Sequence, residues 1–339
     1  MVRFGKAASL ATTFPYIWTH RTTWFGLIKK TGCIFLEPFS ARAVGPDRQA
    51  EARAASGIAM GLGRTIDKSP MAAARDAKKS PKVRRARVVA VVNQKGGVGK
   101  TTTAVNLAAS MAAAERRTLL LDMDPQGNAS SGVGVRPGTR EETVYDVLIG
   151  RVPLEKILIE TKVPYLSVAP STQDLVAAEL ELVDEPNRAT KLKAALAPLL
   201  SRFDYIFIDC PPSLGLLTVN ALTAADRVLV PLQCEYYALE GLTHLMATID
   251  RLKNGMNPGL EVEGIVLTMF DPRNNLAHQV AEEVRKHFHV FDAVIPRNVR
   301  LSEAPSHGKP ILLYDVQSKG SQGYLALARE LLEHHKAKT

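Results

Sequence analysis

The chain has 339 residues, of which 46% are hydrophobic and 23% are charged, so it can form one large α/β domain or two ordinary domains. No apolar run has the length of a membrane-spanning helix, which argues against a membrane-spanning protein and predicts a soluble one. The three cysteines are odd in number, far apart and never in a CxxC pair, which argues against a disulfide scaffold or a zinc–cysteine site and is typical of a reducing cytosol.

The net charge of +9 is concentrated in the first quarter of the chain. Residues 1–85 hold 16 Lys and Arg against 5 Asp and Glu, a net charge of +11. The remainder holds 27 Lys and Arg against 29 Asp and Glu, a net charge of −2. Any DNA binding by the remainder therefore requires a local basic patch and not bulk charge.

Residues 1–85 show no sustained helical or strand periodicity, and we expect a disordered basic extension that ends in the linker KKSPKVRRAR (78–87). Part of this extension could also be upstream sequence from a wrongly assigned start, with translation beginning at Met60 or Met71 instead. A targeting peptide is a second interpretation, because residues 1–45 contain a single acidic residue. A small helical DNA-binding domain is a third, although no capped periodic helix long enough for a recognition helix is present.

From position 86 to about 335 the pattern is that of one α/β domain. Runs that are apolar throughout predict buried strands at RVVAVVN (87–93), TLLLDMD (118–124), YLSVAP (165–170), YIFIDC (205–210), RVLVPL (227–232), VEGIVLTMF (262–270) and FDAVIP (291–296). Helical patterns lie between most of them, as at 101–116, 174–183 and 277–288. Apolar strands that alternate with helices predict a doubly wound, mostly parallel sheet flanked by helices on both faces.

The first predicted strand leads directly into NQKGGVGKTTT (93–103), and a predicted helix follows. Glycines let successive N–H groups turn toward phosphate oxygens, and the helix N-terminus adds positive potential. In such a P-loop Lys100 reaches the β- and γ-phosphates of ATP and the Thr101 hydroxyl binds Mg²⁺. A dinucleotide fingerprint fails on spacing, because its third glycine position falls on Thr102. The predicted nucleotide-binding residues of the loop are Lys95, Gly96, Gly97, Val98, Gly99, Lys100, Thr101 and Thr102.

Gln94 occupies the position at which the strict P-loop pattern has a glycine, and Lys95 follows at once. This KGGVGKTT form resembles the deviant Walker A motif of the ParA/MinD family, and the ParA/Soj chromosome-partitioning ATPases in particular. The resemblance implies that Lys95 crosses the interface of an ATP-sandwich homodimer to the phosphates in the partner subunit. A lysine in that position would act with Lys100 in catalysis, as an arginine finger does.

Acidic residues end two of the predicted strands, where open α/β sheets bind ligands. Asp122 and Asp124 in LLLDMDPQGNASSG (119–132) share one direction, so one can support the Mg²⁺ shell while the other approaches the γ-phosphate; helix capping is the alternative. The resemblance gives Asp124 the catalytic role of orienting the attacking water. Asp209 in FDYIFIDCPPSLG (203–215) resembles the Walker B aspartate and can hold a Mg²⁺-bound water, because a buried carboxylate without a metal partner would be costly.

Two further sets of residues are assigned by the resemblance alone. In IPRNVRLSEAPSHGKPI (295–311), Pro296 and Asn298 match positions that contact the adenine base. Arg273 and Arg300 match basic positions on the DNA-facing surface of ParA-type dimers, and a solvated surface charge is the alternative for each. DNA binding of this kind would be non-specific and sensitive to salt.

The remaining candidates for chemistry are predicted to be structural. We expect Cys210 and Cys234 to be small buried residues and not cluster ligands. The amphipathic stretch QGYLALARELLEHH (322–335) is expected to dock on the sheet through Tyr324, Leu327, Ala328, Leu331 and Leu332. A MinD-type membrane helix is the alternative, but it would carry a more cationic polar face.

The resemblance implies a Mg²⁺-dependent ATPase that acts in the cytoplasm on the nucleoid. ATP would drive homodimerisation and non-specific DNA binding, and hydrolysis stimulated by a ParB-type centromere-binding protein would reset the cycle and move chromosome or plasmid origins. Two alternatives remain: a MinD-like ATPase that cycles on membranes, and a ParA-like protein that positions a protein cargo.

Overall fold

The computed structural model describes residues 85–136, 138 and 141–337. The expected extension, with Cys33 and the possible starts at Met60 and Met71, lies outside the described residues except for Arg85. Among the helices of the described part, none is both long enough and apolar enough to cross a membrane.

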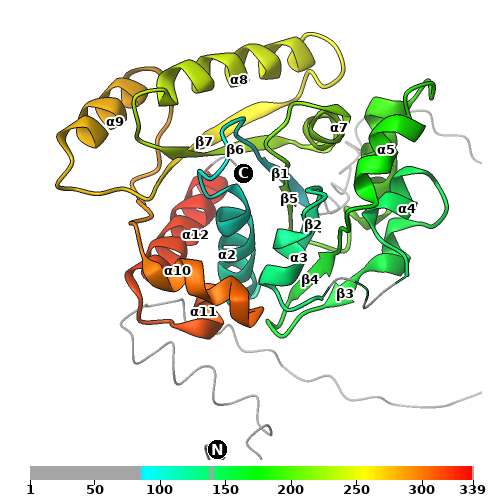
Figure 1. The fold of residues 1–339 in the computed structure, drawn as a ribbon, viewed down its shortest axis with the longest axis horizontal. Helices are drawn as coiled ribbons and strands as arrows, with labels where there is room; N and C mark the ends of the chain where they lie inside the picture. The colour runs from blue at the N-terminus through cyan, green and yellow to red at the C-terminus, as the bar shows by residue number, and fades with distance from the viewer. Residues whose placement is uncertain (1–84, 137, 139–140, 338–339) are drawn as a thin grey trace, which may run out of the picture. The chain divides into compact units, whose positions relative to one another are not determined.

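A seven-stranded sheet runs through the molecule in the order β3–β4–β2–β5–β1–β6–β7 (Figure 1). Its strands are β1 (Arg87–Val91), β2 (Thr118–Asp122), β3 (Ile159–Glu160), β4 (Leu166–Ala169), β5 (Tyr205–Asp209), β6 (Arg227–Gln233) and β7 (Glu261–Thr268). Every neighbouring pair is parallel except β3 with β4, which is antiparallel. The predicted doubly wound, mostly parallel sheet is confirmed; the two-residue strand β3 is too short to have given a pattern in the sequence.

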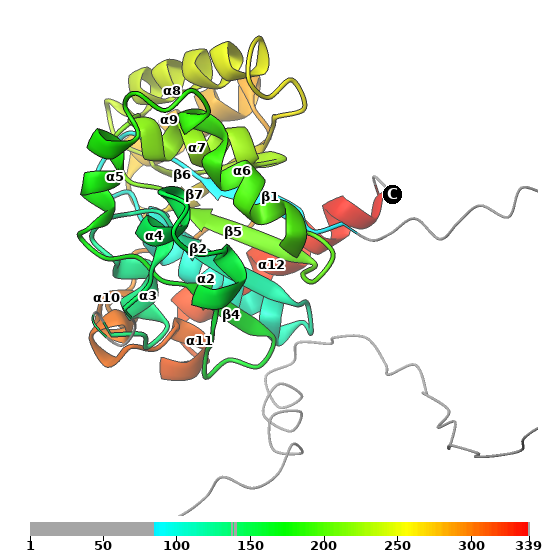
Figure 2. The same ribbon diagram turned by 90° about the vertical axis from the view of Figure 1, so that its right-hand side faces the viewer.

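Helices cover both faces of this sheet (Figure 2). One face carries α2 (Lys100–Ala113), α3 (Asn128–Gly132), α10 (Val299–Glu303), α11 (Ile311–Tyr314) and α12 (Lys319–Ala337). The other carries α4 (Val144–Leu148), α5 (Leu175–Glu181), α6 (Lys191–Leu196), α7 (Leu216–Ala224), α8 (Ala238–Lys253) and α9 (Asn275–His287). Single 3₁₀ turns, η1 (Leu154–Ile157), η2 (Arg188–Thr190), η3 (Ala197–Leu199) and η4 (Ala304–His307), connect several of these elements.

Successive residues of one strand contribute to two different cores. In β1, Val88 and Ala90 pack on the side of α4 to α9, whereas Val89 and Val91 pack on the side of α2 and α12. Because side chains alternate between the faces of a sheet, a strand that is covered on both faces must be apolar at every position. This double burial explains why the strands read as unbroken apolar runs.

The strand predicted at 291–296 is wrong, because Pro296 is the one residue of this segment that forms a bridge, and its partner Phe270 lies just after β7. Its N–H groups are divided between two partners. Those of Phe291 and Ile295 donate to β7 at 2.9 Å and 2.8 Å, whereas the two that directly follow Phe291 donate to the carboxylate of Glu330 on α12, each at 2.9 Å. A segment that gives part of its amide groups to a side chain cannot complete a strand ladder.

The predicted docking of the last helix is confirmed. In α12 the side chains of Tyr324, Leu327, Ala328 and Leu331 are buried in the same core as α2. Leu332 is partly buried against that core. Cys210 and Cys234 are also buried, as the sequence predicts, and both are free thiols.

Candidate nucleotide-binding site

The loop between β1 and α2 lies at the carboxyl edge of the sheet, and three side-chain hydrogen bonds fix its path. Asn93 donates from Nδ2 to the carbonyl of Pro231 in β6 at 2.8 Å and accepts from the N–H of Lys95 at 3.0 Å. Thr268, at the end of β7, donates its hydroxyl proton to the carbonyl of Val98 at 2.8 Å. The loop is therefore tied to both strands that lie on one side of β1.

The glycines of the loop have the conformations that a phosphate cradle requires. Gly97 and Gly99 have φ angles of 76° and 86°, in the left-handed region that glycine tolerates and other residues avoid. A Cβ added at Gly96 or Gly97 would meet no atom within 4 Å. The space beside the loop backbone at these positions is open and can take a phosphate group.

Lys100 is the first residue of α2, and its side chain lies inside the site. Only 7% of the residue is exposed, and Nζ donates to the carbonyl of Lys95 at 3.1 Å. Burial lowers the pKa of Lys100, and the charges of Asp209 and Asp124 act in the opposite direction. The charges of these two carboxylates therefore act on the buried ammonium, and the roles assigned to the three residues stay predictions.

Asp209 ends β5 beside Asp122, which ends β2; the two are register partners and fully buried. Neither carboxylate oxygen of Asp209 accepts a well-formed hydrogen bond within the described part of the chain. Burial, followed by the charge of Asp122, raises the pKa of Asp209 well above its ordinary value, although the Thr101 hydroxyl and the Lys100 ammonium act to lower it. A buried carboxylate with unsatisfied oxygens fits a divalent cation and its bound waters, so the residues present are suited to Mg²⁺.

Asp122 has a different environment, because hydrogen bonds occupy its oxygens. It accepts from the N–H and the hydroxyl of Ser130 at 2.8 Å and 2.7 Å, and from the N–H of Asp124 at 3.2 Å. Burial raises the pKa of Asp122 to about 6, while the bonds from Ser130 act to lower it. Asp122 therefore anchors the start of α3, as the capping interpretation holds, and its contact with a Mg²⁺ shell stays a prediction.

Asp124 lies in the turn that joins β2 to α3. It is 8% exposed, and its Oδ1 accepts from the N–H of Gln126 at 3.0 Å. The bond from Gln126 engages only one of the two carboxylate oxygens, and the charge of Asp124 acts on the nearby Lys100.

Lys95 contacts a residue that the sequence did not single out. Its ammonium forms an ion pair with Glu235, in the loop between β6 and α8, and the two side chains are 38% and 48% exposed. An acidic residue shortly after a strand end is the only signal that the sequence gave for Glu235. The lysine expected to act on a partner subunit is thus bound within its own chain.

The predicted base-contacting residues lie on a segment that follows the end of β7. Phe270, two residues after the Thr268 that contacts the P-loop, forms an isolated bridge with Pro296. Asn298 precedes α10, and its Oδ1 is buried without a hydrogen-bond partner among the described residues.

The two predicted DNA-contacting arginines lie on separate elements, and each has an acidic partner nearby. Arg273 donates from Nε and Nη2 to Asp271, both at 3.0 Å, in the turn before α9. Arg300 in α10 donates to Glu303 at 2.9 Å and lies 3.6 Å from Asp315. Their side chains are 88% and 54% exposed.

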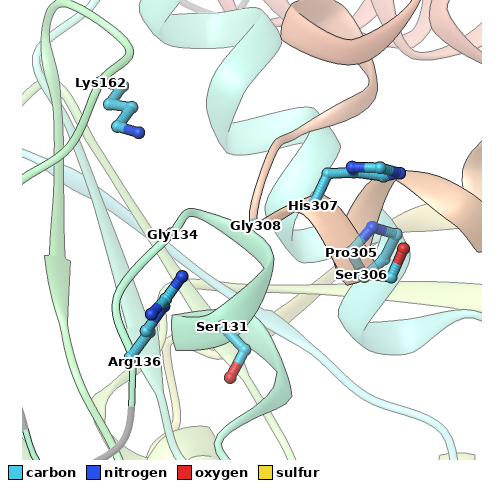
Figure 3. Close-up of a pocket in the computed structure, with 8 residues that line it drawn as sticks. All are labelled: Ser131, Gly134, Arg136, Lys162, Pro305, Ser306, His307 and Gly308. Carbon is cyan, nitrogen blue, oxygen red and sulfur yellow. The ribbon is translucent and has the colours of Figure 1, made fainter. Parts of the chain in front are cut away.

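A hollow of about 450 Å³ lies between the end of α3, the turn from β3 to β4, and η4 (Figure 3). Figure 3 shows Arg136 and Lys162 on one side of it and His307 on the other. Gly134 and Gly308 also line it, and their two backbones approach each other closely. None of the predicted nucleotide-binding residues lines this hollow.

Comparison with known proteins identifies the family. A family described as an AAA domain matches residues 86–262. The chain is 60% identical over 255 residues to the chromosome partitioning protein ParA of Myxococcus xanthus, covering 75% of this chain and 90% of that protein. It is 54% identical over 247 residues to the sporulation initiation inhibitor protein Soj of Bacillus subtilis, covering 72% and 98%. The chain belongs to the ParA/Soj family. The family resemblance that the P-loop motif indicates is therefore confirmed.

A solved structure supports the ParA/Soj fold over the same part of the chain. Cobyrinic acid a,c-diamide synthase from Mycobacterium smegmatis, with bound ADP and magnesium, superposes with a TM-score of 0.67 at 38% identity, covering 75% of this chain and 97% of that chain. The same enzyme has been solved with a bound ATP analogue and magnesium. This ParA/Soj protein is thus similar in fold to a protein with nucleotide and magnesium bound.

Proposed function

We propose that residues 86–335 form a Mg²⁺-dependent ATPase domain that partitions DNA, preceded by an extension over residues 1–85. ATP closes two copies into a homodimer, the dimer binds DNA non-specifically on the nucleoid, and hydrolysis stimulated by a ParB-type partner releases it. The observation that carries this proposal is the cluster of Lys100, Asp124 and Asp209 beside the open P-loop, in a chain that belongs to the ParA/Soj family.

Residues of the loop and of β5 bind the phosphates and the ion. Magnesium, when bound, supplies positive charge that offsets the charge on the phosphate oxygens. The Thr101 hydroxyl and Asp209 would hold it, with Asp122 behind them, and Lys100 would donate to the terminal phosphates in place of the Lys95 carbonyl. The enzyme with bound ADP and magnesium to which this chain is similar supports this assignment.

Two residues supply the chemistry of hydrolysis. Asp124 orients the attacking water through the oxygen that does not accept from Gln126. Lys95 leaves Glu235 and stabilises the charge on the transferring phosphoryl group in the partner subunit. Hydrolysis then depends on dimerisation, because each Lys95 acts on the nucleotide of the partner subunit and not on that of its own chain.

Asn298 and Pro296 form the base-binding part of the site. The buried Oδ1 of Asn298 has no hydrogen-bond donor of its own among the described residues, and the adenine amino group would supply one. A base that carries an oxygen at this position would leave the acceptor unsatisfied, which favours ATP over GTP.

The test is DNA binding in the presence of ATP, ADP and no nucleotide. Wild type is expected to bind DNA more tightly with ATP than with ADP or without nucleotide. Lys100→Ala is expected to lose nucleotide binding and, with it, this ATP-dependent increase in DNA affinity. Lys95→Ala is expected to bind ATP but not dimerise, and Asp124→Ala to hold DNA longer because it does not hydrolyse ATP. Lys286→Ala, which removes another exposed, ion-paired lysine, serves as the control and should match wild type.

Equal DNA affinity in all three nucleotide states would refute this function. ATP-dependent binding to anionic vesicles without DNA binding would instead support a MinD-like protein. ATP-dependent DNA binding that does not respond to a ParB-type protein would point to a protein cargo.

A further inference from the structure

A second cluster of chemically active side chains lies at the opposite edge of the sheet. Glu263 is the third residue of β7, and His334 and His335 are near the end of α12. Their potential ligand atoms all lie within 4.8 Å of one another. Tyr205, at the amino end of β5, contacts this cluster, whereas Asp209 at the carboxyl end of the same strand belongs to the nucleotide site. Four residue steps of a strand separate the two by about 13 Å.

The cluster is buried and convergent. Glu263 is 2% exposed and His335 is 5% exposed. Nδ1 of His334 and Nε2 of His335 each lie 2.9 Å from the same carboxylate oxygen, Oε1 of Glu263. Two nitrogens and one oxygen therefore face a common point.

The second oxygen of Glu263 gives an independent indication of a missing ligand. Oε2 is buried and accepts no hydrogen bond from the described residues; its nearest cation is Nε of Arg227, at 3.7 Å. Leaving a buried carboxylate oxygen unsatisfied costs free energy that a bound cation would recover.

We propose that Glu263, His334 and His335 form a binding site for a divalent transition metal of the zinc type. Two imidazoles, one carboxylate and a water complete the four ligands of a zinc ion with an open position. The exposed His289, whose ring centroid lies 5.1 Å from that of His334, is close enough to replace the water after a small movement.

The surroundings favour zinc over magnesium. Magnesium needs an octahedron of oxygens, whereas imidazole nitrogens suit zinc and its neighbours. Arg227 adds positive charge beside the site, but Glu261 forms an ion pair with the same guanidinium and offsets it. Arg87 in β1 adds further positive charge near His335. The affinity of the site for a cation therefore has to come from the nitrogen lone pairs and not from the net charge.

To bind a metal, each ring must carry its proton on the nitrogen that faces away from Glu263, so that the nitrogen facing Glu263 presents its lone pair. Nδ1 of His335 lies 3.0 Å from the Tyr205 hydroxyl. This hydroxyl can accept a hydrogen bond from a protonated Nδ1 or donate one to an unprotonated Nδ1. This is the second hydrogen bond that metal-binding histidines normally make.

Zinc in this position would join the end of α12 to β7. The test uses the full chain without a histidine tag, treated with EDTA, dialysed and free of nucleotide. Wild type is expected to bind one Zn²⁺ per chain by calorimetry and elemental analysis, and to unfold at a higher temperature with Zn²⁺ than without.

Loss of a ligand should be visible in matched variants. His334→Gln and His335→Gln are expected to weaken Zn²⁺ binding at least about 100-fold, and Tyr205→Phe about 10-fold, since removing even an outer partner of a ligand costs about 10–100-fold. His287→Gln removes an exposed histidine that lies 3.5 Å from a carboxylate and should bind as wild type does.

Failure of wild type to bind Zn²⁺ below about 100 μM would overturn the proposal, a limit that corresponds to about −5.5 kcal/mol. Equal binding by wild type and His334→Gln would overturn it as well. His334 is 28% exposed, so this variant is expected to fold and decides the question even where His335→Gln does not fold.

Discussion

At the scale of single residues, the buried carboxylate of Asp209 is the feature that most clearly indicates a binding site for a cation. Its carboxylate is fully buried beside Asp122, and its oxygens lack well-formed hydrogen bonds among the described residues. Such a group does not stabilise the fold, because removing a charge from water costs free energy that only a closely paired partner can recover. The protein without nucleotide should therefore be less stable for having it.

Asp209→Asn is expected to stabilise the nucleotide-free protein and to weaken Mg²⁺-ATP binding. A raised pKa means that the folded protein disfavours the ionised form, so Asp209 lowers the free energy of unfolding as pH rises above about 4, its value in the unfolded chain. Removing this buried carboxylate should stabilise the protein by about 1 kcal/mol or more at pH 7 and by less at pH 5.

Urea unfolding at the two pH values measures the first effect. Calorimetry with Mg²⁺-ATP measures the second, for which a loss of about 10–100-fold is expected. A variant that is less stable than wild type at pH 7 would contradict this account of Asp209.

The ion pair between Lys95 and Glu235 predicts how readily the dimer forms. Glu235→Gln should release Lys95 and strengthen ATP-dependent dimerisation about 2–30-fold, because two exposed pairs worth about 0.2–1 kcal/mol each no longer have to be broken. Sedimentation with ATP measures the association constant.

The control is Glu240→Gln, an exposed acidic residue in the first turn of α8, which should not change dimerisation. Unchanged or weaker association of Glu235→Gln would show that the pair does not oppose dimerisation. The stability of the single chain should change by less than about 1 kcal/mol in either variant.

At the scale of elements, the contact between α3 and η4 depends on two glycines. Gly134 has a φ of 90°, and a Cβ added to it would lie 2.9 Å from the carbonyl oxygen of Gly308. This close approach places the end of α3, whose start is anchored by Asp122, against the segment that follows Arg300 and Glu303. The turn that carries Asp124 leads into α3, and the segment that carries Asn298 leads through α10 into η4, so both lead into elements that pack together.

Gly134→Ala is expected to lower the free energy of unfolding by about 1–3 kcal/mol more than Gly150→Ala does. Gly150 has a similar φ of 82°, but a Cβ there would meet nothing within 4 Å, so it carries only the cost of the left-handed backbone. Urea unfolding of both variants measures the difference. Equal losses would mean that the contact with Gly308 has no part in stability.

At the scale of the whole molecule, charge is divided unequally along the chain. Residues 1–85 carry a net +11 and the remainder a net −2. Within the described residues the two candidate DNA-contacting arginines also have acidic partners. We therefore expect DNA binding to have two components. One depends on the basic residues of segment 1–85, and the other depends on bound ATP.

A chain that begins at Met71 should lose much of the DNA affinity that does not depend on nucleotide and retain the difference between ATP and ADP. Residues 1–70 carry 10 Lys and Arg against 4 Asp and Glu, and the slope of log affinity against log salt becomes shallower by about 0.9 for each phosphate that the protein no longer neutralises. DNA binding measured over a series of salt concentrations gives both quantities. Identical salt slopes for the two chains would show that the segment does not bind DNA.

Much of the fold could be predicted because burial on both faces of the sheet leaves a simple pattern. Six apolar runs became the parallel strands, and α2, α5, α9 and α12 lie where helical patterns were predicted, whereas no pattern was singled out for α8. The prediction at 291–296 failed because the sequence of a short apolar segment does not show where its amide groups form hydrogen bonds. Here two of them bond to the side chain of Glu330 and not to a neighbouring strand.

The sequence by itself determined the family, the parallel sheet and the phosphate loop, because each follows from residue types at fixed spacing along a short segment. Only the tertiary structure decided which groups from distant segments meet: Lys95 with Glu235, Asp122 with Ser130, and Glu263 with His334 and His335. Such contacts join residues up to 140 positions apart, and no local pattern of the chain encodes them. The sheet brings them together, because its order places β7, the last strand, beside β6 and leaves its amino end under α12.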